Sequence, residues 1–205
     1  MKRSKMKKLF SKSVLALVCL LSRTPFCMLY AFADVASFVL YRIVRYRLKV
    51  VRGNLKIMFP HKSDEERREI EKRFYRHFAD YVVETLKGVT IPKPEVMKRF
   101  VIRNPELIDE YNKAGRSVFV YSAHQGNWEW FITMPQYFPN SIIQTFYQPQ
   151  SSKLVDEITL MARTREGIVA VESQKGYRHI VTCQREGKVA TTLIIGDQSP
   201  HRGAQ

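Results

Sequence analysis

A histidine and a glutamate five residues apart are the side chains in this sequence best suited to chemistry. His124 follows the apolar run 117–121, which is typical of a buried strand, and Gly126 stands between the two residues. If a helix begins near Gly126, Glu129 lies in its first turn and can reach back to the imidazole. A carboxylate on one ring nitrogen fixes the tautomer and raises the basicity of the other nitrogen. The pair therefore suits a general base that takes a proton from a hydroxyl.

The same spacing also fits a surface histidine beside a helix-capping glutamate. A glycine at position 126 would let a substrate approach the backbone closely. Free N–H groups at the start of the helix could stabilise an oxyanion. The neighbouring elements therefore decide between the two interpretations.

Alternating helices and strands are predicted around this pair. Ser63 and Glu66 form a capping-box pattern ahead of a long amphipathic helix. Apolar patterning predicts helices at 64–87, 106–113, 128–134, 153–165 and 177–185, and strands at 100–102, 117–121, 142–147, 168–171 and 189–195. This alternation predicts an α/β fold with a mostly parallel sheet flanked by helices, whose ligands bind beyond the carboxyl ends of the strands.

The positive charge is concentrated in the first quarter of the chain. Residues 1–56 hold thirteen basic residues and one acid, Asp34, which accounts for +12 of the net charge of +15. The basic clusters flank an apolar stretch, and anionic lipid headgroups attract such clusters by about 1 kcal/mol per Lys or Arg. Apolar residues beside basic ones favour a membrane over nucleic acid as the partner. The three cysteines form no C-x-x-C pair, which argues against a disulfide framework and a zinc site.

The apolar stretch 13–41 predicts an N-terminal membrane-associated helical segment. As one helix it would run about 43 Å, longer than a bilayer core of about 30 Å, but Arg23-Thr24-Pro25 interrupts it. A tilted span, a shallow hairpin and an interfacial helix all remain open. A cleaved secretory signal ending at Ala31-Phe32-Ala33 is the alternative. We expect residues 1–48 to be the basic N-terminus and anchor, and 49–205 the catalytic domain.

The sequence resembles the bacterial lipid A biosynthesis (late, or secondary) acyltransferases of the lysophospholipid acyltransferase-like superfamily. The resemblance covers about residues 20–198, and its most specific part is the run from His124 to Glu129. The patches that carry it are Arg52-Gly53-Asn54-Leu55 with Phe59-Pro60, His124-Gln125-Gly126-Asn127-Trp128-Glu129, Tyr147-Gln148-Pro149, Arg163-Thr164-Arg165-Glu166-Gly167 and Gly196-Asp197-Gln198.

The resemblance implies a glycerol-phosphate acyltransferase-like fold and a defined reaction. His124, with Glu129 as its partner, would deprotonate a hydroxyl of a lipid A precursor, which then attacks the thioester of acyl carrier protein or CoA. No cofactor and no metal is implied. Substrate-binding roles would fall to Gly126, Asn127, Arg163, Arg165 and Asp197. The implied location is the bacterial inner membrane, with membrane lipids as partners, no nucleic acid, and the catalytic domain on the cytoplasmic face.

Alternative functions follow from the same motifs. A glycerol-phosphate or lysophospholipid acyltransferase would use the same histidine on a smaller acceptor, and a truncated, inactive membrane-bound homologue is a further possibility. Members of the resembled family are typically longer than this chain, so we expect it to be incomplete at the C-terminus. On that basis the strand at 189–195 would form an exposed sheet edge.

Overall fold

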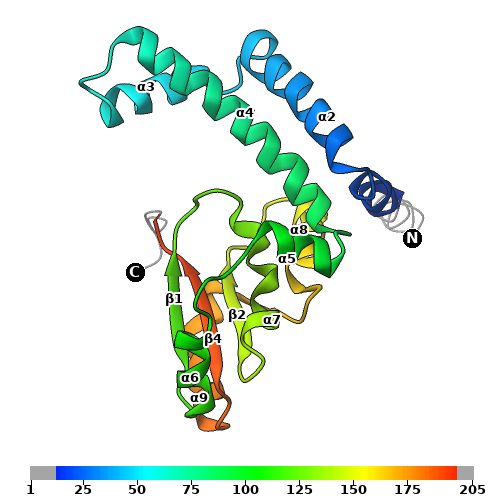
Figure 1. The fold of residues 1–205 in the computed structure, drawn as a ribbon, viewed down its shortest axis with the longest axis vertical. Helices are drawn as coiled ribbons and strands as arrows, with labels where there is room; N and C mark the ends of the chain where they lie inside the picture. The colour runs from blue at the N-terminus through cyan, green and yellow to red at the C-terminus, as the bar shows by residue number, and fades with distance from the viewer. Residues whose placement is uncertain (1–12, 198–205) are drawn as a thin grey trace. The chain divides into compact units, whose positions relative to one another are not determined.

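A computed structural model describes residues 13–197, so the basic residues before position 13, together with Gln198 and His201, lie outside the described residues. The chain divides into two compact units (Figure 1). One is the helical unit, Leu20–Lys87; the other is the α/β unit, which among the described residues comprises Gly88–Asp197 and Ser13–Cys19. The boundary predicted after residue 48 falls inside the helical unit.

The α/β unit contains one parallel sheet, as predicted. Its strands pair in the order β1-β4-β2-β3, and all three pairs are parallel. β4 therefore lies between β1 and β2, and the expectation that the strand at 189–195 forms a sheet edge is wrong. The edges among the described residues are β1 and β3. The strands are β1 (Val118–Ser122), β2 (Ile142–Tyr147), β3 (Val169–Glu172) and β4 (Ala190–Ile195).

Helices cover both faces of the sheet. On one face, Asn112 of α6 donates a hydrogen bond to Thr191 Oγ1 at 2.9 Å. On the other face, Gly176 at the start of α9 lies so close to the Phe146 ring that a Cβ there would stand 3.1 Å from it. The helices of this unit are α5 (Lys93–Arg99), α6 (Glu106–Lys113), the 3₁₀ helix η2 (Trp128–Thr133), α7 (Met134–Tyr137), α8 (Lys153–Thr164), the 3₁₀ helix η3 (Ser173–Lys175) and α9 (Gly176–Arg185).

Two predicted elements differ from the structure. Residues 100–102 form no strand. The Phe100 ring packs edge-on against Phe131, with 5.0 Å between centroids, while Val101 is exposed. The helix predicted at 128–134 is a 3₁₀ helix followed by the short α7, because Pro135 in the first turn of α7 has no N–H to continue the earlier hydrogen-bond ladder.

The helical unit consists of two long segments joined by shorter helices. The predicted interruption at 23–25 is confirmed, because the helix Ser13–Ser22 ends there and α2 begins at Phe26. The elements are α2 (Phe26–Phe38), the π-helical turn η1 (Val39–Ile43), α3 (Leu48–Met58) and α4 (Asp64–Gly88).

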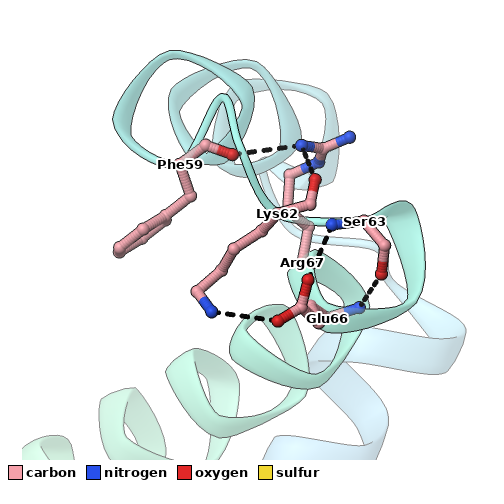
Figure 2. Close-up of polar contacts among 5 residues, drawn as sticks. All are labelled: Phe59, Lys62, Ser63, Glu66 and Arg67. Atoms are coloured by element: carbon pink, nitrogen blue, oxygen red, sulfur yellow. Dashed lines mark hydrogen bonds and ion pairs between the residues drawn. The ribbon is translucent and has the colours of Figure 1, made fainter.

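The predicted capping box at the start of α4 is confirmed (Figure 2). Glu66 accepts a hydrogen bond from Ser63 N–H at 2.8 Å, and Ser63 Oγ accepts one from Glu66 N–H at 3.2 Å. Arg67 of α4 donates to the Phe59 carbonyl, which ties the start of α4 to the end of α3. Such a cap stabilises a helix by about 1 kcal/mol, and here it sets where α4 begins.

Candidate active site

A cavity of about 350 Å³ in the α/β unit brings together three of the predicted site residues. His124 comes from the loop after β1, Glu129 from η2 and Arg163 from α8. The rest of the wall is polar and apolar in about equal parts, and its apolar part is a group of large side chains. This group includes Phe131, Ile132, Met134, Ile143, Ile168, Leu193 and Ile195.

His124 is held by Asp197. The imidazole Nδ1 lies 2.6 Å from Asp197 Oδ1, and the backbone N–H of His124 donates to Oδ2 at 3.0 Å. The sheet register explains this contact, because Ser122 of β1 pairs with Ile195 of β4. Each partner therefore stands two residues beyond a paired strand end. Trp128 supports the ring from the side, edge-on, with 4.7 Å between ring centroids.

The electrostatics of this pair favour an ionised carboxylate. The hydrogen bond with the His124 side chain, and then that from its backbone N–H, hold the pKa of Asp197 below its ordinary value of 3.8. Asp197 therefore carries a negative charge near neutral pH, and a proton taken up by His124 would form an imidazolium beside it. A carboxylate in that position stabilises the imidazolium.

Glu129 contacts a different group. Its oxygens accept hydrogen bonds from Arg163 Nε at 2.8 Å and from Nη2 at 2.5 Å, a two-point ion pair. The Glu129 side chain is 11% exposed and that of Arg163 25%, so both charges are largely removed from water. The carboxylate that contacts the imidazole in the structure is thus Asp197. The role of Glu129 as the partner of His124 stays a prediction.

The other predicted site residues take structural positions. Gly126 has φ +60°, a left-handed conformation that glycine adopts readily. Asn127 Oδ1 accepts a hydrogen bond from Glu129 N–H at 3.2 Å and so caps η2. Arg165 donates to the Ile91 carbonyl and to Glu166. The structure brings none of these three into the cavity wall. Within residues 13–197, no group of three or more His, Cys, Asp or Glu side chains is placed to hold a metal ion.

Tyr121 and Gly196 support the site without having been predicted to do so. The Tyr121 hydroxyl donates to the Gly196 carbonyl at 2.5 Å, which joins the β1 and β4 ends just before His124 and Asp197. A Cβ atom added to Gly196 would stand only 2.3 Å from the Tyr121 ring. No local pattern signals such a contact between residues 75 positions apart.

Replacing Gly196 with alanine should displace the Tyr121 ring and break its hydrogen bond. Because the Tyr121 side chain is exposed and can swing aside, the expected loss in the free energy of unfolding is at the low end for a hydrogen bond, about 0.5 kcal/mol, measured by urea denaturation. Gly53→Ala in α3 is the matched control. A Cβ at Gly53 meets nothing within 4 Å, so that variant should gain about 0.5–1 kcal/mol. Equal stability changes in the two variants would contradict the packing described.

The fold and the site together define the class of protein. It is an α/β protein with a candidate site beyond the carboxyl ends of parallel strands, the usual position for a ligand in this class. The family described as "Bacterial lipid A biosynthesis acyltransferase" matches the chain over residues 2–204. The chain therefore belongs to this family of transferases, which suggests an acyltransferase activity in lipid A biosynthesis. No curated protein sequence matches it significantly.

Proposed function

We propose that the protein moves a fatty acyl chain from an acyl thioester to a hydroxyl of a lipid A precursor. The observation that carries this proposal is the His124–Asp197 pair, whose imidazole lines a cavity with both apolar and polar walls. Either acyl carrier protein or CoA would bear the thioester. A glycerol-phosphate or lysophospholipid acceptor is the alternative within the same chemistry.

His124 acts as the general base in the proposed reaction. Asp197 occupies Nδ1, which leaves Nε2 to take the proton from the acceptor hydroxyl. The hydroxyl oxygen attacks the thioester carbonyl carbon, the C–S bond then breaks, and the leaving thiolate takes the proton from the imidazolium. The acyl group passes directly to the acceptor, so no acyl-enzyme, metal or cofactor is required.

The cavity walls suit the proposed substrates. The apolar side chains can surround an acyl chain, whose burial is favourable by about 0.8 kcal/mol per CH₂. Arg163 supplies a guanidinium, a permanently charged group with five N–H donors, and Glu129 accepts hydrogen bonds from its Nε and Nη2. We assign it to the acceptor phosphate or to the oxyanion of the tetrahedral intermediate, with Glu129 holding it in position.

The proposed enzyme works at the bacterial inner membrane, with its α/β unit on the cytoplasmic side. Phe26–Ile43 is the one helical stretch among the described residues that is long and apolar enough to cross a bilayer by length and composition. Such a helix also fits a signal sequence or a core helix. Support for the membrane therefore comes from its combination with the basic residues on either side.

Competition between acceptors tests the proposal. The purified full chain, supplied with an acyl thioester, should acylate a lipid A precursor, and mass spectrometry should show one added acyl chain. Excess glycerol 3-phosphate should leave that rate unchanged within twofold. Transfer to glycerol 3-phosphate in preference to the lipid A precursor would support the alternative, and transfer to neither would overturn the proposal.

A further inference from the structure

The apolar helix α2 is bound to α4 along its length (Figure 1). Near its start, the Thr24 carbonyl accepts a hydrogen bond from Lys87 Nζ at 2.9 Å. Midway, Tyr30 donates to Glu84 at 2.7 Å. The contacts continue through the ion pair of Asp34 with Arg76 at 3.2 Å and the stacking of Tyr41 on Tyr75. The two helices therefore run antiparallel, and Leu29 and Ala33 are buried.

The partner helix is too polar to enter a bilayer. Over the stretch that contacts α2, α4 carries Arg76, His77, Asp80, Glu84 and Lys87. If Phe26–Ile43 crossed the membrane in this arrangement, these side chains would enter the hydrocarbon beside it. Each charge at the bilayer centre disfavours insertion by about a hundredfold. If α2 separated from α4 and inserted alone, Glu84 would lose its hydrogen bond from Tyr30, and Lys87 would lose its hydrogen bond to the Thr24 carbonyl.

The face of α2 away from α4 is apolar and exposed. Met28, Phe32, Val35 and Phe38 recur every three or four residues, the spacing of one helix face, and each is at least half exposed. Exposed arginines follow the helix: Arg42, Arg45 and Arg47. The one acid between residues 13 and 56, Asp34, is paired with Arg76. An apolar face bordered by cations fits an anionic lipid surface.

We propose that α2 lies in the plane of an anionic bilayer surface and does not cross it. Met28, Phe32, Val35 and Phe38 enter the boundary between headgroups and acyl chains, while α4 stays on the aqueous side. This inference deepens the proposed function. It rests on that function, because an enzyme acting on a lipid A precursor works at a lipid bilayer. It places α2 and α4 on one side of the membrane.

Depth measurements along α2 separate a surface helix from a span. A nitroxide or fluorescent label is placed on single cysteines at Met28, Val35 and Phe38, in a full chain whose Cys19, Cys27 and Cys183 are replaced by alanine. Quenching by lipids labelled at different depths should place all three at one shallow depth in phosphatidylglycerol-containing vesicles. A span would put Val35 near the bilayer centre, about 15 Å deeper than the interface. A maximum depth at Val35 would overturn the proposal.

Vesicle binding provides a second readout that does not depend on acyl transfer. Phe32→Asp should weaken partition into vesicles of phosphatidylcholine and phosphatidylglycerol about tenfold. Leu107→Asp is the matched control, because Leu107 is equally exposed at 61% but lies on α6 of the α/β unit. Omitting phosphatidylglycerol should weaken binding of the unaltered chain as well. Equal binding of the two variants, or binding indifferent to phosphatidylglycerol, would count against the proposal. A chain that binds as expected but transfers no acyl group would overturn the proposed function alone.

Discussion

Replacing His124 with alanine is expected to lower the rate of acyl transfer to a lipid A precursor by about 10²–10⁴-fold. The variant keeps the cavity and the Glu129–Arg163 ion pair but has no imidazole to take the hydroxyl proton. The loss should appear in kcat, because the proton is transferred in the transition state and not when the substrate binds. Single-turnover transfer of a radiolabelled acyl group from its thioester measures this step directly.

His61→Ala is the matched control for this experiment. His61 is an exposed histidine in the loop between α3 and α4, so its loss should leave acyl transfer unchanged. Vesicle binding should be the same in both variants, because neither side chain lies on the apolar face of α2. Undiminished turnover in the His124 variant would remove the general base from the mechanism.

The elements that hold the site were predictable where local signals were strong. The helix at 106–113 and the strand at 142–147 match the structure at both ends. Gly115 stops the helix with φ +76°, and the apolar run of the strand is bounded by polar and proline residues. The strand predicted at 100–102 was wrong, because a run of three apolar residues occurs in loops as well as in strands.

The strand order and the partner of the imidazole were not predictable in the same way. Among the strands of the described residues β4 comes last in sequence, yet it pairs with both β1 and β2. Long-range packing makes that choice, and no local pattern encodes it. Both His124 and Asp197 were identified as site residues. Sequence spacing could not predict the pairing of Ser122 with Ile195, which places His124 beside Asp197. Glu129 was the nearer carboxylate in sequence and therefore the favoured partner.

Two carboxylate substitutions separate the roles of Asp197 and Glu129. Asp197→Asn should lower kcat by about 10²–10⁴-fold, because the imidazolium formed in the reaction loses its counter-charge. Glu129→Gln keeps the contact between Asp197 and His124 but leaves Arg163 without its two-point partner. Its main effect should be a raised KM for the phosphorylated acceptor, with kcat lowered far less than by Asp197→Asn.

The pH dependence of stability checks the Asp197 assignment independently of activity. The pKa of Asp197 is depressed in the folded state, so its contribution to stability is present above the ordinary value of 3.8 and is lost as pH falls through the folded-state value. The Asp197→Asn variant should therefore be less stable than the unaltered chain at neutral pH, and the difference should shrink in acid.

Kinetics of the double variant decide whether the two carboxylates act on one group. If Glu129 acts through Arg163 and Asp197 through His124, the two losses in kcat/KM should multiply. If instead Glu129 is the partner of the imidazole during turnover, Glu129→Gln alone should lower kcat as Asp197→Asn does. The double variant would then lose little more than either single variant, because both changes remove support from the same ring. That result would show that Glu129 is the partner of His124 during turnover, and that Asp197 positions His124 only in the resting enzyme.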